Sequence, residues 1–165
     1  MRSVRQSGLE TALYIALVLG ASIGLDAKGP TVKLTITGPG LAAPVEIVEP
    51  AILDASNVFG GSFLGETLQA APPVETPIYT VSFHVQSPEW MRRPVKAMYA
   101  VSVARDTRTG ALWLYLPGRG EAGYALNVGT ILRDGQDGHW HRPPLAWASA
   151  IGTYLPRPRA QGLRP

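Results

Sequence analysis

The feature that most constrains this chain is a strict alternation of apolar and polar residues in short segments. Residues 31–37 place Val32, Leu34 and Ile36 on one side, and residues 79–86 alternate in the same way. A period of two residues is typical of a β-strand that buries one face. The chain is therefore predicted to build a β-sheet with one apolar face.

Further strands are predicted over residues 45–48, 95–104, 111–116 and 124–132. The segment 111–116 is apolar on both faces, so we expect it to lie centrally in the sheet with both faces covered. Turn-forming residues at 106–110 join it to the strand before it. The connections are too short for crossover helices, and the sheet is therefore predicted to be antiparallel.

One helix is predicted near the C-terminus, over residues 145–155. Its apolar stripe at helical spacing consists of Leu145, Ala148, Ile151 and Leu155. A single helical turn is expected from Pro50, and residues 57–65 are expected to form an ordered loop with aromatic anchors. The predicted fold class is α+β and mostly β: a single antiparallel sheet or a small sandwich, with one C-terminal helix packed on it.

Residues 1–27 have the composition of an export signal. Arg2 and Arg5 precede 15 uncharged residues rich in Leu, Ile, Val and Ala. A membrane-spanning helix needs about 20 apolar residues, so this shorter run suits a cleaved signal peptide. Small residues place the cut after Gly24 or after Ala27. The alternatives are an uncleaved membrane anchor and a buried N-terminal helix of the domain.

The excess positive charge of the chain lies at its C-terminal end. The formal net charge is +3, from 15 Lys and Arg against 12 Asp and Glu, and Arg157, Arg159 and Arg164 account for all of it. We expect residues 156–165, which also hold three prolines, to be a disordered basic tail. Residues 28–155 then form a single β-rich domain of balanced charge, which does not favour nucleic-acid binding.

The absence of cysteine excludes several classes of site. Disulfides, iron–sulfur clusters, cysteine-based zinc sites and a thiol nucleophile all need this residue. With 45% hydrophobic and 16% charged residues, the chain has the composition of a globular protein. We therefore expect a folded domain without disulfides and without a cofactor.

His139 and His141 are the best candidates for metal ligands. They stand two residues apart, so an extended segment places both imidazoles on one face. His84, Asp134 and Asp137 are candidates to complete a metal shell, although spacing fixes no third ligand. The alternative is a pair of histidines on a polar strand face or in a loop.

Other side chains suit contact with a partner molecule. Trp90 stands near Arg92 and Arg93 between two predicted strands, and such a group can stack on sugar rings or contact an anionic polymer. The alternative is a solvated connection between the strands. Arg119 in a glycine-rich turn and Trp140 between the two histidines are further candidate binding residues.

Residues 118–123 match the G-x-G-x-x-G pattern of phosphate-binding loops. In a dinucleotide site those glycines lead into a helix whose first N–H groups meet a pyrophosphate. Here the next segment is predicted to be a strand, so we interpret the motif as a turn between two strands. Ser62 lacks the flanking pattern of a hydrolase nucleophile and has no assigned base.

Four segments carry a resemblance to a group of uncharacterised bacterial exported proteins. The segments are residues 36–41, 44–47, 115–120 and 127–130. The likeness extends over nearly all of the predicted domain, from Thr31 to Leu155. It implies a single exported β-rich domain and carries over no catalytic residue.

These observations favour a non-enzymatic role. No acid, base, nucleophile and metal set is assembled, so we expect an exported interaction or structural module, periplasmic or extracellular, with an envelope or extracellular partner. Its contact surface is predicted in the loops at 57–65, 88–94 and 117–123, and it would touch a membrane only through an uncleaved N-terminal segment. The first alternative is an envelope protein that binds a metal or small ligand through His139 and His141. The second is an unrecognised hydrolase.

Overall fold

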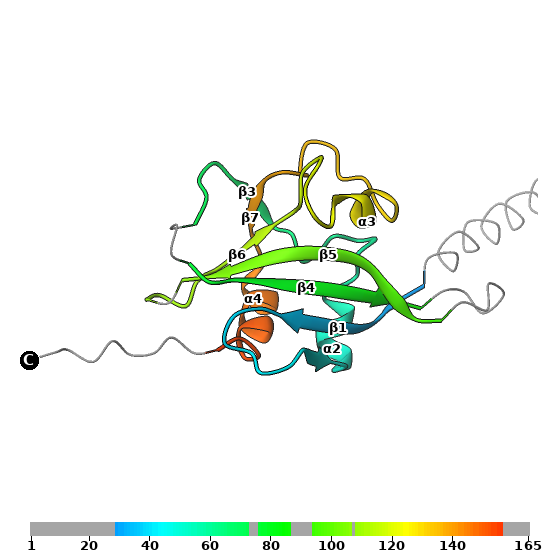
Figure 1. Cartoon of the computed structure of the whole chain (residues 1–165), viewed down its shortest axis with the longest axis horizontal. Helices are drawn as coiled ribbons and strands as arrows, with labels where there is room; N and C mark the ends of the chain where they lie inside the picture. Colours follow the sequence, from blue (N-terminus) through cyan, green and yellow to red (C-terminus); the bar gives the residue numbers. More distant parts are fainter. Residues whose placement is uncertain (1–28, 73–75, 87–93, 107, 157–165) are drawn as a thin grey trace, which may run out of the picture. The chain divides into compact units, whose positions relative to one another are not determined.

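The computed structural model describes residues 29–72, 76–86, 94–106 and 108–156 of the chain. The predicted export signal and all of the predicted tail except Pro156 lie outside these residues. The described part contains one open seven-stranded antiparallel sheet with three helices (Figure 1). The predicted fold class is thus confirmed, in its single-sheet form.

The strands run in the order β2-β1-β4-β5-β6-β7-β3 across the sheet. The long strands β4 and β5 lie at its centre, and every pair of neighbours is antiparallel. Both edge strands have three residues, which leaves little edge for pairing with another chain. The strands are β1 (Thr31–Thr37), β2 (Val45–Ile47), β3 (Glu66–Leu68), β4 (Ile78–Val85), β5 (Lys96–Arg105), β6 (Leu112–Tyr115) and β7 (Trp140–Arg142).

One face of the sheet carries the core. Alternate residues of five strands are buried there, among them Leu34, Val81, Val101, Leu114 and His141. The helices α2 (Pro50–Asp54) and α4 (Leu145–Gly152) contact each other, and in the view of Figure 1 α4 lies below β4 and α2 extends below β1. Together with buried side chains of the loop at 56–64, they remove the apolar face from water.

The rotation of α4 differs from the one predicted. Leu145 is 82% exposed, whereas Trp147, Ile151 and Leu155 are buried. The indole N–H of Trp147 donates a hydrogen bond of 2.9 Å to the buried hydroxyl of Ser56, which fixes that side of the helix against the core. The true stripe therefore has four-residue spacing from Trp147, and Leu145 is left at the surface.

The segment predicted as a strand at 124–132 is instead the short helix α3 (Tyr124–Val128) and a turn. The reason is the side chain of Asn127, which is fully buried beside β5. Its amide oxygen accepts from the N–H of Ala100 at 2.7 Å, and its amide nitrogen donates to the carbonyl of Ala100 at 2.6 Å. Since β6 pairs with β5 only from Ser102 onward, one side chain does here what a neighbouring strand would do.

The role of Asn127 makes a stability prediction. Asn127→Asp keeps the shape of the side chain but removes the donor, so the Ala100 carbonyl loses its partner and faces a carboxylate. We expect the free energy of unfolding at pH 7 to fall by about 2 kcal/mol, measured by urea denaturation. Leu126→Ala, on the exposed side of the same helix, is the matched control and should change it by less than about 1 kcal/mol. An equal loss in both variants would contradict the account.

Candidate functional site

His141 is a buried residue of β7 whose two ring nitrogens both have partners. Its Nε2 lies 3.1 Å from the carbonyl oxygen of Gln136, so Nε2 carries the proton and donates it. Its Nδ1 lies 3.4 Å from the hydroxyl of Thr67, which can donate in return. Burial lowers the pKa of His141 below its ordinary value, and the Gln136 carbonyl opposes that shift only in part. The neutral ring of His141 thus links β7 both to β3 and to the turn that precedes β7.

The other predicted metal ligands do not gather around His141. His139 is exposed, and His84 lies on β4, which β5 and β6 separate from β7. The His84 ring is instead 2.9 Å from the hydroxyl of Thr35. Within the described ranges, no three His, Cys, Asp or Glu residues come close enough together to hold a metal ion. Metal binding through His139 and His141 stays a prediction.

Trp140 lies on the opposite face of the sheet from the core, half-buried against Tyr115. Their ring centroids are 5.0 Å apart at an interplanar angle of 42°. The Tyr115 hydroxyl donates to Glu121 at 2.9 Å, and burial together with this carboxylate raises the pKa of Tyr115 to about 12. Trp140 is therefore one half of a packed aromatic pair, with only part of its ring open to a partner.

Arg119 is exposed in the glycine-rich turn, whose form is set by Glu121. The carboxylate of Glu121 accepts the N–H of Gly118 at 2.7 Å. The turn leads into α3 and not into a strand, which corrects the prediction of a turn between two strands. The helix that follows has five residues. The remaining candidate binding residues, Trp90, Arg92 and Arg93, lie outside the described residues.

The loop at 57–65 is mainly part of the core. Val58, Phe63 and Leu64 are buried, and the guanidinium of Arg133 donates to the Val58 carbonyl. Phe63 packs against the sheet and against α4. The aromatic anchoring predicted for this loop is thus confirmed, while most of its apolar surface is turned away from any partner.

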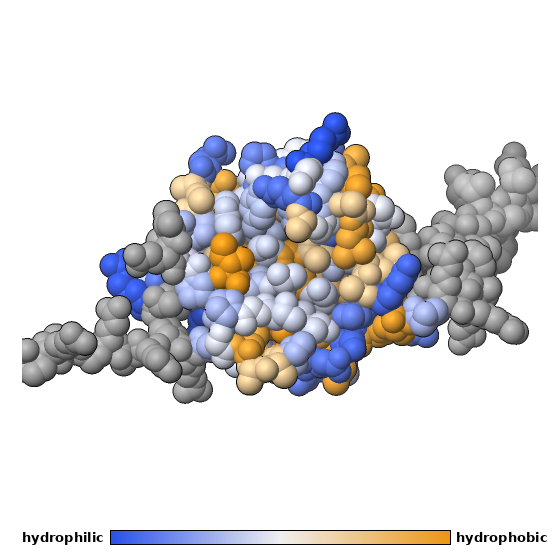
Figure 2. All heavy atoms as spheres, viewed as in Figure 1, coloured by the Kyte–Doolittle hydropathy of each residue, from blue (hydrophilic) through white to orange (hydrophobic). Residues whose placement is uncertain are grey.

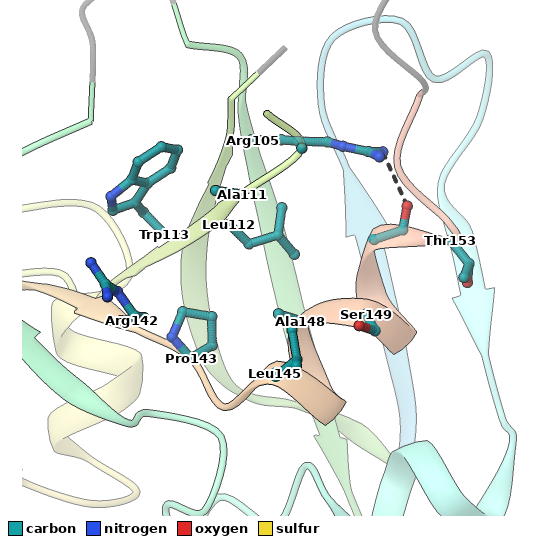
Figure 3. A pocket seen from close by; sticks show the side chains of 12 residues that line it. Arg105, Ala111, Leu112, Trp113, Arg142, Pro143, Leu145, Ala148, Ser149 and Thr153 are labelled. Atoms are coloured by element: carbon teal, nitrogen blue, oxygen red, sulfur yellow. Dashed lines mark hydrogen bonds between the residues drawn. The ribbon is translucent and has the colours of Figure 1, made fainter. Parts of the chain in front are cut away.

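A concavity in the part of the chain that the structure describes was not predicted. It is a groove of about 720 Å³ between the start of β6, the end of β7 and one side of α4 (Figure 3). We call it the α4 groove. It is lined by Arg105, Gly110, Ala111, Leu112, Trp113, Arg142, Pro143, Leu145, Ala148, Ser149, Gly152 and Thr153.

The α4 groove exists because β6 and β7 separate. Their ladder consists of Leu114 with His141 and Tyr115 with Trp140, and it stops there. Pro143 is the first residue after β7, and it has no N–H for a further ladder bond. The chain then turns at Pro144 into α4, which passes below the open part of β6.

The α4 groove combines an apolar lining with positive charge. Leu112, Pro143 and Ala148 supply apolar surface, and Figure 3 shows Arg105 and Arg142 on opposite sides of it. Among the described residues that line the groove there is no carboxylate, so none of them neutralises either guanidinium. Such a lining complements a molecule that has both an apolar part and a negative charge.

The two arginines are held differently. Arg105 donates through Nη1 to the carbonyls of Gly152, Leu155 and Pro156, at 3.0, 3.0 and 3.2 Å. It therefore caps the C-terminal end of α4, where carbonyl groups lack helical partners. Arg142 is exposed, and among the described residues its side chain forms no ion pair or hydrogen bond. Arg142 is thus the guanidinium that a ligand can engage without displacing a structural contact.

The lining of the α4 groove does not form a hydrolytic centre. Its hydroxyl groups are those of Ser149 and Thr153, and none of the described residues that line it is a histidine or a carboxylate. A serine without a neighbouring base is a weak nucleophile. The side chains of the described residues that line the groove thus contain no acid–base pair.

The surface seen in the direction of Figure 1 mixes apolar and polar side chains. In Figure 2 the apolar side chains of this face form small groups among polar ones. None of the helices of the described residues has the length and apolar character that crossing a bilayer requires.

Comparisons with known proteins gave no relative. Neither the family models, nor the curated proteins, nor the solved structures contain a match to this chain.

The buried histidine makes a prediction about pH. Because the folded pKa of His141 lies below the ordinary value of 6.5, the unfolded chain takes up its proton first as the pH falls. This contribution to stability is complete above pH 7 and is lost progressively below about pH 6.5. We expect His141→Ala to lower the free energy of unfolding at pH 7.5 by about 2 kcal/mol and to flatten its dependence on pH, measured by urea denaturation in EDTA.

His139→Ala is the control, since it removes an exposed ring, and it should change stability by less than about 0.5 kcal/mol. If both variants lost the same stability, and only when metal was present, the two histidines would be metal ligands and the structural role would be wrong.

Proposed function

We propose that this chain is a non-enzymatic binding module that holds an amphipathic anion in the α4 groove. The observation that carries the proposal is the lining itself: two arginines stand on opposite sides of an apolar floor, and none of the described lining residues is a carboxylate. An apolar ligand alone would not need the arginines, and a small hydrophilic anion would not need the floor. A carboxylate with an attached apolar group uses both.

The exposed rim of the groove supports the same proposal. Leu145, at the start of α4, is 82% exposed and lies on the groove. When a ligand covers a large exposed apolar side chain, the binding free energy becomes more favourable by about 25 cal/mol per Å² of apolar area removed from water. Leu145 is thus placed to contact the apolar part of a ligand.

The proposed setting is outside the cytoplasm. The composition of residues 1–27 supports export, either as a cleaved signal or as a membrane anchor. The absence of cysteine is compatible with an oxidising compartment, where disulfides are permitted but not required. We propose a periplasmic or extracellular protein whose ligand is met there.

The proposal is tested by titrating the protein with octanoate in a calorimeter. We expect saturable binding with one site per chain, and much weaker binding of octanol, which has the same tail without the charge. Arg142→Gln should weaken octanoate binding about tenfold, because it removes a charge-assisted hydrogen bond. Ala148→Trp, which fills the floor, should abolish it.

The control variant is Arg119→Gln, which removes the same charge from a turn outside the groove. It should bind octanoate like the unaltered protein, and the thermal melting of all three variants shows whether they are folded. Equal losses in Arg119→Gln and Arg142→Gln would indicate unspecific attraction of anions and would contradict the proposal.

A further inference from the structure

We propose that the ligand of the α4 groove is an extended acidic peptide segment of a partner protein, which adds to β6 as a short antiparallel strand. This inference rests on the proposed function and names the class of molecule that the groove takes. It follows from the direction of the backbone groups of β6, which the side-chain chemistry of the groove does not reveal.

The pairing of β6 with its neighbours fixes the direction of its backbone groups. On one side the N–H of Asp106 donates to the carbonyl of Ala111, so the backbone N–H and carbonyl groups of Ala111 and Trp113 point toward β5. On the other side the N–H of Leu116 donates to the carbonyl of His139. Because backbone groups alternate in direction along a strand, the N–H and carbonyl groups of Leu112 and Leu114 point to the same side as those of Leu116, toward β7.

Leu114 meets His141 on that side, whereas Leu112 meets the α4 groove. The residue of the β7 segment that would pair with Leu112 is Pro143, which lacks an N–H. Among the described residues, no backbone hydrogen bond joins Leu112 to Pro143. The N–H and carbonyl of Leu112 thus stay open at the wall of the groove, although Leu112 itself is only 8% exposed.

Open backbone groups beside a helix suit an added strand. The carbonyl of a peptide residue opposite Leu112 accepts a hydrogen bond from the N–H of Leu112, and the N–H of that peptide residue donates to the carbonyl of Leu112. These two bonds continue the ladder from the point where β7 leaves it. The carboxylate of a fatty acid accepts hydrogen bonds but donates none, so it can satisfy the N–H of Leu112 but not the carbonyl. The open backbone pair therefore favours a peptide over other amphipathic anions.

The faces of the groove set the side chains of such a peptide. Leu112 points toward α4, so the peptide residue opposite it also points toward α4 and its apolar floor (Figure 3). The next residue of the peptide points to the other face, where Trp113 and Arg142 lie. An apolar residue beside an acidic one thus places a carboxylate near Arg142, an attraction that a lysine lacks; Glu66 lies opposite Arg142 on β3 but forms no ion pair with it.

The experiment uses a six-residue peptide of alternating glutamate and leucine, acetylated and amidated at its ends, with binding measured by calorimetry. We expect one site per chain, and at least tenfold weaker binding of the peptide in which lysine replaces glutamate. Octanoate should compete with the peptide, because both occupy the α4 groove. Arg142→Gln should weaken peptide binding about tenfold, and Arg119→Gln should leave it unchanged.

Two backbone-methylated forms of the peptide test the added strand itself. One leucine lies opposite Leu112 in this pairing and the other leucines share its orientation, so their N–H groups point to the β6 side, and methylating them should weaken binding at least tenfold. The N–H groups of the glutamates point away from β6, and methylating them should change binding less than threefold. The two peptides have the same composition, charge and number of methyl groups.

Equal affinity of the two methylated peptides, with octanoate still bound, would overturn the strand proposal and leave the amphipathic-anion site intact. Loss of octanoate and peptide binding together would overturn the proposed function as well. Tight binding of the lysine peptide would show that Arg142 does not select the ligand and would also overturn the inference.

Discussion

The packing of Phe63 against both the sheet and α4 is the contact on which the rest of this fold depends. A single sheet with one apolar face is unstable in water until something covers that face. The ring of Phe63 lies 4.8 Å from that of Phe83 and 5.9 Å from that of Trp147, centroid to centroid, so a loop residue joins the sheet to the helix. With Trp147 held there and bonded to Ser56, α4 has one permitted rotation.

That rotation also determines what the surface offers. Placing Trp147 in the core turns Leu145 outward, beside the point where Pro143 ends the ladder of β6 and β7. The α4 groove is thus a consequence of the fold, formed where a strand pair opens above a helix. Arg105 secures its far end by capping α4, while Arg142 remains available. The same arrangement leaves the backbone of Leu112 open to a ligand.

Local periodicity predicted the strands that alternate strictly, and long-range contacts decided the rest. β1, β4 and β5 follow directly from their alternation, because one face of each is buried. The segment at 124–132 has strand-like composition, yet Asn127 pairs with Ala100 through its side chain, and a single sequence carries no signal of that partner. β3 is short and mostly polar, so its sequence has no alternating apolar pattern from which its pairing with β7 could be predicted. The groove was missed for the same reason, since Arg105, Arg142 and Leu145 become neighbours only when the sheet has formed. The one available signal was the proline pair after residue 142, which marks the end of a ladder.

The N–H of Leu112 has no ladder partner at the point where β7 leaves β6. Amide hydrogen exchange, followed residue by residue by NMR, measures this directly, with Leu114 as the internal reference because its ladder partner is present. We expect the Leu112 amide to exchange faster than the Leu114 amide in the free protein and at least tenfold more slowly when the glutamate–leucine peptide saturates the groove. If the Leu112 amide exchanged as slowly as the Leu114 amide in the free protein, or if bound peptide left its exchange unchanged, the backbone of Leu112 would not be an open site for a peptide strand.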